Sequence, residues 1–369
     1  MTAPIRLADA YAGKRVFLTG HTGFKGGWLA LWLADLGAEV TGYALAPDTD
    51  PSLFVAAGVA GACRSSVVAD VRDRARLAQA LADAQPDFVF HLAAQPLVRL
   101  SYREPLGTLE TNVMGTANLL EAVRSLARPC AVVVVTSDKC YENREWQYGY
   151  REDDAMGGHD VYSMSKGAAE LVVGSWRRSF FDPARLAQHG VALATARAGN
   201  VIGGGDWCMD RLVPDAIRAL GRGLAVPVRN PEAVRPWQHV LEPLSGYLEL
   251  GARLAVGRAE RAELCGPFNF GPLASEAFPV ERVMDEIVRH WGEPGARWED
   301  RRDPNAPHEA TLLRLAIDKA WARLGWKPRW TLSEALRRTV EWYRAQGRGG
   351  TPAELRALCS AHIRDYMVA

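Results

Sequence analysis

The sequence has no surplus of charge of either sign and no long apolar run. Its 369 residues include 44 Lys and Arg against 43 Asp and Glu, a formal net charge of +1 at pH 7. Without a basic excess, the chain has no electrostatic footprint for nucleic acid or for an anionic membrane. The longest apolar run near the middle, Ala131 to Val135, has strand length, whereas a membrane-crossing helix needs ~18–20 residues. We therefore expect neither nucleic acid nor a membrane among its partners.

Paired cysteines and metal-binding histidine patterns are also missing. The six cysteines contain no Cys-x-x-Cys, which favours reduced thiols in a cytoplasmic protein over a disulfide frame or a zinc site. The histidines form no His-x-x-x-His or His-Glu-x-x-His pattern, and we predict that no metal is bound. The first residues, Met1 to Gly13, lack a charged start followed by an apolar stretch, so we expect no secretion signal.

The composition is that of a globular protein, with 48% hydrophobic and 24% charged residues. Up to about residue 200, segments of strand length alternate with segments of helical periodicity, as in a Rossmann-type doubly wound parallel sheet. After Val201 the alternation stops, and Trp, Pro and Arg become frequent. We predict an α/β protein with a cofactor domain at 1–200, joined by a returning segment at about 238–272. A smaller mixed α/β C-terminal substrate lobe would occupy 201–237 and 273–369.

A glycine loop follows the first predicted strand. Lys14 to Thr19 reads as a buried strand, the loop carries three glycines, and Gly27 to Leu36 has helical periodicity. Glycines in this place let the backbone approach a pyrophosphate at the N-terminus of the helix. The spacing is G-x-x-G-x-x-G, and a glycine-rich turn without a ligand is the alternative. The residues predicted to hold a dinucleotide here are Gly20, Gly23, Phe24, Lys25 and Gly26.

The second predicted strand leaves the kind of dinucleotide open. Glu39 to Leu45 does not end on the acid that usually holds the ribose hydroxyls of NAD, and no acid follows until Asp48. Both NAD and NADP therefore remain possible. Lys25, inside the glycine loop, is available either to a 2′-phosphate or to solvent.

Further predicted strands end on small or polar residues. Val67 to Val71 carries Asp70, an acceptor for an adenine amino group, and Phe88 to His91 runs into Leu92-Ala93-Ala94-Gln95. Small residues after a parallel strand let a flat ligand pass close to the backbone. The cofactor contacts predicted at these strand ends and at the next one are Asp70, Val71, Leu92, Ala93, Ala94 and Thr136.

Tyr162 and Lys166 lie four residues apart in a predicted helix that runs to Phe180, so their side chains share one face. A phenol has a pKa of about 10, and a cation one turn away favours the phenolate, so the pair is expected to accept a proton nearer neutral pH. Alone, this spacing is common among mere surface neighbours.

Ser137, at the end of a preceding strand, completes a dehydrogenase arrangement. Tyr162 would take a hydroxyl proton, Ser137 would hold that oxygen, and Lys166 would tune Tyr162 and hold the nicotinamide ribose.

Long stretches over nearly the whole chain resemble one family. They are TGHTGFKGGWL (Thr19–Leu29), HLAAQPLVRLSY (His91–Tyr102), TNVMGT (Thr111–Thr116), TSDKCYEN (Thr136–Asn143), GYRE (Gly149–Glu152), RAGNVIGGGDW (Arg197–Trp207) and RPWQHVLEPLSGYL (Arg235–Leu248). These stretches resemble the extended short-chain dehydrogenases/reductases that act on nucleotide sugars, and among them the CDP-glucose 4,6-dehydratases.

The resemblance implies an NAD-dependent dehydration of CDP-glucose in deoxysugar biosynthesis. Tyr162 deprotonates the C4 hydroxyl while hydride leaves C4 for the cofactor, and the new ketone acidifies the C5 proton. That proton is then removed, water leaves from C6, and hydride returns to C6. The expected product is CDP-4-keto-6-deoxyglucose, with an NAD-binding first domain and a nucleotide-sugar-binding lobe.

Asp138 and Lys139 stand where the related dTDP-sugar dehydratases have Asp and Glu. The resemblance makes Asp138 the acid that gives a proton to the leaving hydroxyl. Lys139 can be the base only if its pKa lies well below ~10.4, a shift that burial and nearby cations produce. The alternatives are that Lys139 only steadies the enolate, or that the two residues form a surface ion pair.

The resemblance also assigns the substrate contacts and an oligomer. Asn200 and Arg235 match positions that hold the sugar and the diphosphate, and an Arg fork suits phosphate oxygens. Helices 106–126 and 162–180 resemble the four-helix interface of a homodimer, or of a homotetramer that contains it, with packing on the sheet as the alternative. The predicted substrate contacts are Gln95, Ser137, Asn200, Arg235 and Arg302.

Two other functions compete with this one. A 4-epimerase, or a dehydratase for another nucleotide, would use much of the same site, but an epimerase needs no acid and base after the strand serine. A non-catalytic NAD(P)-binding sensor would not need Ser137, Tyr162 and Lys166 together. No hydrogen-bond code for cytosine can be read from the residues, so CDP rests on the resemblance.

Overall fold

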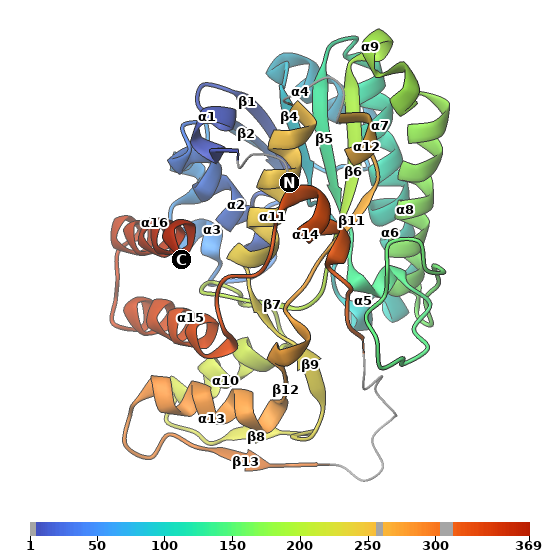
Figure 1. The fold of residues 1–369 in the computed structure, drawn as a ribbon. Coiled ribbons are helices and arrows are strands. Elements are labelled where there is room, and N and C mark those ends of the chain that lie inside the picture. The colour runs from blue at the N-terminus through green and yellow to red at the C-terminus, as the bar shows by residue number, and fades with distance from the viewer. Residues whose placement is uncertain (1–4, 256–260, 303–312) are drawn as a thin grey trace.

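Seven parallel strands form the central sheet, in the order β11-β6-β5-β4-β1-β2-β3 (Figure 1). The computed structural model describes residues 5–255, 261–302 and 313–369. The strands of this sheet are β1 (Arg15–Thr19), β2 (Glu39–Ala44), β3 (Ser65–Val68), β4 (Phe88–His91), β5 (Cys130–Val135), β6 (Val191–Ala198) and β11 (Pro267–Phe270). Because all are parallel, their carboxyl ends lie along one edge, where such sheets bind ligands. The predicted Rossmann-type α/β fold is confirmed.

Side chains of each strand alternate between two apolar layers. On β5, Val132 belongs to one buried cluster and Val133 to the other. Helices therefore cover both faces of the sheet (Figure 1), which explains why its central strands are apolar throughout. These helices are α4 (Arg74–Ala84), α7 (Gly115–Ser125) and α8 (Val161–Ser179) on one face, and α2 (Phe24–Asp35) and α11 (Leu241–Ala255) on the other.

Smaller sheets and two helices lie below the large sheet in Figure 1. They are built from β7 (Val201–Ile202) with β10 (Gln238–His239), β9 (Val234–Pro236) with β12 (Ala277–Pro279), β8 (Val226–Val228) with β13 (Trp298–Asp300), α10 (Leu212–Leu220) and α13 (Val280–Trp291). β11 and α11, from the segment predicted to return, lie in and against the large sheet. The division into two domains stays a prediction, and 303–312 lie outside the described residues.

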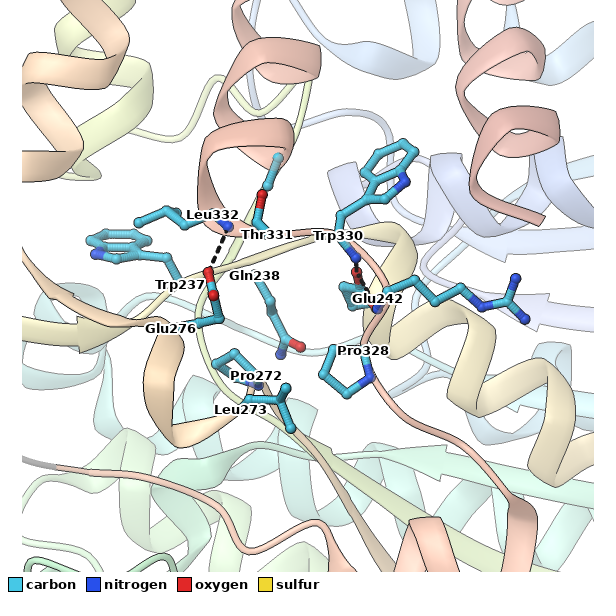
Figure 2. A pocket seen from close by; sticks show the side chains of 12 residues that line it. Trp237, Gln238, Glu242, Pro272, Leu273, Glu276, Pro328, Trp330, Thr331 and Leu332 are labelled. Carbon is cyan, nitrogen blue, oxygen red and sulfur yellow. Dashed lines mark hydrogen bonds between the residues drawn. The ribbon is translucent and has the colours of Figure 1, made fainter. Parts of the chain in front are cut away.

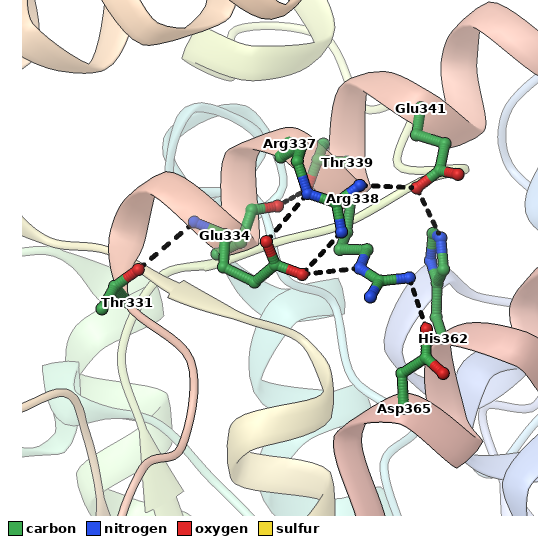
Figure 3. Close-up of polar contacts among 9 residues, drawn as sticks. Thr331, Glu334, Arg337, Arg338, Thr339, Glu341, His362 and Asp365 are labelled. Atoms are coloured by element: carbon green, nitrogen blue, oxygen red, sulfur yellow. Dashed lines mark hydrogen bonds and ion pairs between the residues drawn. The ribbon is translucent and has the colours of Figure 1, made fainter. Parts of the chain in front are cut away.

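Helices α15 (Leu332–Gly347) and α16 (Pro352–Val368) close the chain. An ion pair of 2.7 Å between Arg338 and Asp365 joins them, and His362 Nε2 lies 3.2 Å from Glu341 Oε2 (Figure 3). The His362 ring also stacks on Trp28 of α2, with 6.3 Å between ring centroids. The C-terminal helix thus supports the helix that begins at the glycine loop.

The shorter helices complete the description. They are α1 (Leu7–Tyr11), α3 (Leu53–Ala56), α5 (Val98–Arg103), α6 (Pro105–Leu109), α9 (Leu186–His189), α12 (Arg261–Leu264) and α14 (Asp318–Leu324). In the described part of the chain, no helix combines the length and the hydropathy that a membrane crossing requires.

Two predicted boundaries, the end of one strand and the start of one helix, are wrong. β3 ends at Val68. The carboxylate of Asp70 accepts a hydrogen bond from the backbone N–H of Arg72 at 2.8 Å, and this contact begins a turn. The helix after the loop begins at Phe24, three residues earlier than predicted, since Gly23 has the extended backbone of an N-cap.

Two other helices differ from the prediction. The helix expected at 106–126 is interrupted by a π-helical turn at 110–114, between α6 and α7. The sequence does not predict α11, because this helix is buried on nearly all sides and contains Pro243, so no amphipathic stripe marks it.

A buried ion pair joins α8 to the ends of β5 and β6. Glu170 of α8 accepts hydrogen bonds from Arg197 Nη2 at 2.9 Å and from the hydroxyls of Thr136 and Thr195 at 2.5 and 2.8 Å. The side chains of Arg197 and Glu170 are 1% and 3% exposed. Glu170 lies one turn after Lys166 on the same face of α8. The pair therefore fixes the helix of the Tyr-Lys pair against the strand ends.

Arg197 extends this hydrogen-bond network to β11. Its Nη1 donates to the Tyr141 hydroxyl at 2.7 Å and to the Glu152 carbonyl at 2.9 Å. The Tyr141 hydroxyl donates to Asn269 Oδ1 at 2.7 Å, and Asn269 Nδ2 donates to the Tyr150 carbonyl at 2.8 Å. The loop after β5 is thereby tied to both β6 and β11.

The change Glu170→Gln tests this ion pair. It removes one charge and leaves the Arg197 guanidinium buried without its counter-ion, which typically costs ~3–5 kcal/mol. We expect a fall of about 3 kcal/mol in the free energy of unfolding, measured by urea titration. The matched control is Glu121→Gln, since Glu121 pairs with Arg124 near the surface, where such pairs contribute less than ~1 kcal/mol. Equal losses in the two variants would contradict the role given to Glu170.

Candidate active site

The ends of β1 and β4 approach each other closely at the glycine loop. Gly20 has φ +80°, and a Cβ there would lie 2.8 Å from the Ala93 nitrogen. Thr19 Oγ1 accepts hydrogen bonds from the N–H groups of Leu92 and Ala93, both at 3.1 Å. Position 20 thus requires glycine, both for its backbone conformation and for its space.

The N-terminus of α2 presents its backbone to the same place. Gly23 is the N-cap, and no side chain caps the helix, so the N–H groups of its first turn are donors for a ligand. Gly26 packs directly on the loop, where a Cβ would lie 2.0 Å from the Gly20 carbonyl oxygen. This arrangement suits a pyrophosphate. The predicted residues 20–26 are therefore brought together, except for the side chain of Lys25.

The other predicted cofactor residues follow neighbouring strands along the same edge. Asp70 and Val71 follow β3, Leu92 to Ala94 follow β4, and Thr136 follows β5. The Asp70 carboxylate is bound by Arg72, whose hydrogen bonds lower the pKa of Asp70. The adenine contact proposed for Asp70 stays a prediction.

Tyr162 and Lys166 lie at the start of α8. Asp160 caps this helix, accepting a hydrogen bond from the backbone of Ser163 at 2.9 Å. Lys166 Nζ lies 5.9 Å from the centroid of the Tyr162 ring. Burial lowers the pKa of Lys166 to about 8, and burial raises the pKa of Tyr162 to about 12, against a lowering by its hydrogen bond with Ser137. The pKa of the phenol is therefore not lowered as expected in the protein alone, because desolvation of the phenolate outweighs the hydrogen bond with Ser137 and the charge of Arg211.

Ser137 and Asp138 occupy the turn after β5. Ser137 Oγ donates to Asp138 Oδ1 at 2.9 Å and accepts from the backbone N–H of Lys139 at 3.2 Å. Asp138 is 7% exposed, and burial raises the pKa of its carboxyl against the opposing charges of Lys139 and Lys25. Gly199 makes room for it, since a Cβ there would lie 2.9 Å from Asp138 Oδ2. A carboxyl with a raised pKa is suited to hold a proton and then donate it.

Lys25 turns toward these residues and not toward β2. Its Nζ lies 3.5 Å from the hydroxyl of Tyr247 on α11 and 5.8 Å from the centroid of that ring. Burial lowers the pKa of Lys25 to about 8, Arg211 and Lys166 lower it further, and Asp138 raises it. The side chain of Lys25 therefore extends toward α11 and is half-buried, and its two predicted roles, toward a 2′-phosphate or toward solvent, stay predictions.

Arg211 is a further cation that no motif indicates. Its Nη1 lies 2.8 Å from Asp206 Oδ2, and the Asp206 side chain is 4% exposed. Its charge lowers the pKa of both Lys25 and Tyr162. Only the folded chain shows this placement, because the loop that leads into α10 has no regular pattern.

A cavity of about 280 Å³ opens beside Asp138. Gly199 and Pro236 also line it, and the segments at 271–274 and 314–318 form other parts of its wall. Asn200 and Arg235 are the chain neighbours of two of these residues. The cavity brings the acid of the site together with the segments from which substrate contacts were predicted.

Two predicted substrate residues point elsewhere. The side-chain nitrogen of Gln95 donates to the Thr108 hydroxyl at 2.9 Å. Arg302 is exposed and pairs with Asp300 at 2.7 Å and with Glu232 at 3.0 Å. It is not among the described residues that line the cavity.

A second cavity, of about 80 Å³ (Figure 2), shares Pro272 and Leu273 with the first, but Asp138 does not line it. Its wall includes Gln238, Glu242 and the segment at 328–332. The Glu242 carboxylate is already engaged by the backbone N–H groups of Arg329 and Trp330. We therefore place the chemistry at the larger cavity.

The comparison with known sequences points to nucleotide-sugar dehydratases. A family model described as GDP-mannose 4,6 dehydratase matches residues 17–339. The chain is 52% identical to the CDP-glucose 4,6-dehydratase of Salmonella typhimurium (strain LT2), over 97% of this chain and 98% of that protein. It is 26% identical to the dTDP-glucose 4,6-dehydratase of Shigella flexneri, over 75% and 78% of the two chains.

Solved structures have the same fold. MoeE5 in complex with UDP-glucuronic acid and NAD superposes with a TM-score of 0.71 at 25% identity, over 90% of this chain and 99% of that one. DesIV, a dTDP-glucose 4,6-dehydratase from Streptomyces venezuelae with NAD and TYD bound, gives 0.74 at 24% identity, over 91% and 98%. The resemblance found in the sequence is confirmed, and the chain belongs to the GDP-mannose 4,6-dehydratase family of nucleotide-sugar dehydratases.

Proposed function

We propose that this protein converts CDP-D-glucose to CDP-4-keto-6-deoxyglucose, a step of deoxysugar biosynthesis. The observation that carries the proposal is the buried carboxyl of Asp138, hydrogen-bonded to Ser137 at 2.9 Å and facing the cavity. Oxidation at C4 alone needs no such acid, whereas the loss of water from C6 does. The identity over nearly the full length of the CDP-glucose enzyme supports the choice of nucleotide.

We propose NAD as the cofactor, held by the glycine loop, the uncapped N-terminus of α2 and the strand ends beside them. NAD, when bound, supplies the oxidant that takes hydride from C4 and returns it at C6. Lys25, the cation available for a 2′-phosphate in the sequence, lies instead beside Tyr247. That placement favours NAD over NADP, as do the two similar structures that hold NAD.

Each proton transfer of the reaction is assigned to a different residue. Tyr162 takes the proton of the C4 hydroxyl, Ser137 holds that oxygen, and Lys166 stabilises the charge that develops on the phenol. The ketone at C4 then acidifies the C5 proton, which Lys139 removes. Asp138 gives its proton to the C6 hydroxyl, which leaves as water. When hydride is returned at C6, Lys139 gives its proton back to C5.

A panel of nucleotide sugars tests the proposed function. The protein is incubated with NAD⁺ and with CDP-, dTDP-, GDP- or UDP-linked glucose, and the alkali-stable absorbance of a 4-keto sugar is followed. We expect keto product from CDP-glucose at a rate well above the others. Absence of product from CDP-glucose would overturn the proposal. A faster reaction with another nucleotide sugar would show that the substrate carries a different nucleobase.

The change Lys139→Met tests the base. Because the amine is proposed to remove the C5 proton, we expect exchange of that proton with deuterated water to fall by roughly 10²- to 10⁴-fold. Reduction of the cofactor by the C4 hydrogen should continue. Undiminished exchange at C5 would remove Lys139 from this role. Lys327→Met, at an exposed position, is the matched control and should leave exchange unchanged.

We also propose that the protein assembles through the helices at 106–126 and 162–180. Met164 and Leu171 lie on one face of α8 and are 40% and 63% exposed, and Leu106 and Met114 on the neighbouring helix are 72% and 55% exposed. Apolar side chains at these positions suit contact with a second copy. A homodimer with a four-helix interface, alone or within a homotetramer, accounts for them.

The change Leu171→Glu tests this interface. A charge on this apolar face should shift the protein to a smaller assembly in light scattering after size-exclusion chromatography. Leu224→Glu changes a leucine that is 57% exposed, in the turn between α10 and β8, and should leave the mass unchanged. An unaltered mass for Leu171→Glu would argue against assembly through α8.

A further inference from the structure

The proposed reaction leaves two residues out of proton balance. Tyr162 gains the proton of the C4 hydroxyl, and Asp138 loses its proton to the departing water, while Lys139 returns to C5 the proton that it took. After one turnover Tyr162 therefore holds one proton more than at the start, and Asp138 holds one fewer. The excess and the deficit are equal, so one transfer from Tyr162 to Asp138 restores the site.

Both residues are enclosed by the protein. Tyr162 is 8% exposed and Asp138 is 7% exposed. The helix of Tyr162, α8, packs directly on the turn after β5, where a Cβ at Gly167 would lie 3.2 Å from the Cys140 carbonyl oxygen. A bound sugar would cover the side of Asp138 that faces the cavity. Exchange of protons with bulk solvent is therefore hindered at both residues.

Ser137 connects the two. Its Oγ donates to Asp138 Oδ1 at 2.9 Å, accepts from the backbone N–H of Lys139 at 3.2 Å, and hydrogen-bonds with the Tyr162 hydroxyl. A hydroxyl has one proton and two lone pairs, so Ser137 can accept from the phenol while it donates to the carboxylate. While Asp138 is protonated, the Ser137 proton is available to the C4 oxygen. Once the carboxylate forms, that proton is drawn to Asp138.

We propose that Ser137 relays a proton from Tyr162 to Asp138 after each loss of water. The phenol O–H bond breaks as its proton passes to Ser137 Oγ, and the proton of Ser137 passes to Asp138 Oδ1. A phenolate and a carboxylic acid result, and no proton is exchanged with solvent. Gly199 leaves space beside Asp138 Oδ2, so the carboxyl can turn and present the new proton to the cavity. The inference rests on the proposed function.

Burial and charge act on both ends of this relay. Burial raises the pKa of the Asp138 carboxyl, so the carboxylate that remains after the loss of water takes up a proton readily. Burial also raises the pKa of Tyr162 to about 12, which opposes the loss of its proton. The Lys166 ammonium stabilises the phenolate that forms, since its Nζ lies 5.9 Å from the centroid of the Tyr162 ring.

The change Ser137→Ala tests the relay. Without the hydroxyl the excess proton leaves Tyr162 only through solvent, so the steady-state formation of keto sugar from CDP-glucose with NAD⁺ should fall by roughly 10²- to 10⁴-fold. A small buffer molecule can then carry protons to Asp138, because the cavity of about 280 Å³ opens beside it. The rate of Ser137→Ala should therefore rise with imidazole concentration at constant pH and ionic strength, whereas the rate of the parent should not.

Two further variants serve as controls. Ser137→Thr keeps the hydroxyl, so it should recover most of the lost rate and respond to imidazole as little as the parent does. Ser65→Ala, at an exposed serine, should behave as the parent. Loss of the contact with the C4 oxygen alone would slow Ser137→Ala equally at every imidazole concentration, which separates the relay from that role.

Two outcomes would overturn the inference. A rate of Ser137→Ala that does not respond to imidazole, a rate of zero included, would show that no missing proton transfer limits this variant. An equal rise in the parent and in Ser137→Ala would show that Asp138 regains its proton from solvent in both. Failure of the proposed function is a different result, because the parent protein would then form no keto product from CDP-glucose in any buffer.

Discussion

The buried ion pair between Glu170 and Arg197 is the interaction on which the site depends. Glu170 lies one turn after Lys166 in α8 and accepts hydrogen bonds from residues at the ends of both β5 and β6. Its partner Arg197 reaches the loop after β5 and, through Tyr141, the strand β11. A single pair of charges thus sets the position of the catalytic helix relative to the strand ends. Such pairs add little net stability over apolar packing, but removal of one member is costly.

A second constraint follows from burial. The centre gathers the side chains of Lys25, Lys139, Lys166 and Arg211 near the carboxyl of Asp138, and burial affects groups of both signs of charge. Burial lowers the pKa of Lys25 and Lys166 to about 8 and raises the pKa of Asp138. The amines therefore lie near the range where they exchange protons, and the acid holds its proton more readily. The apolar surroundings that stabilise the fold therefore also shift the pKa values of these groups toward the range in which they can transfer protons.

Much of the fold follows from local patterns. The alternation of apolar strands and amphipathic helices predicts the parallel sheet, and glycines after β1 predict the loop at the start of α2. What the sequence does not reveal depends on contacts between distant segments. The direction of Lys25 is set by Tyr247, more than 200 residues away, and Arg211 reaches the site from a loop without regular structure. The raised pKa of Tyr162 likewise depends on burial by the whole fold, which the spacing of Tyr and Lys does not indicate.

The central claim is that oxidation at C4 and reduction at C6 use the same hydrogen, with water lost between them. The most direct test is to convert CDP-glucose carrying deuterium at C4 and to locate the label in the product by NMR. The account predicts a 4-keto-6-deoxy sugar with the deuterium at C6 and no net change in the cofactor. A product without deuterium at C6, or a stoichiometric gain of reduced cofactor, would contradict it.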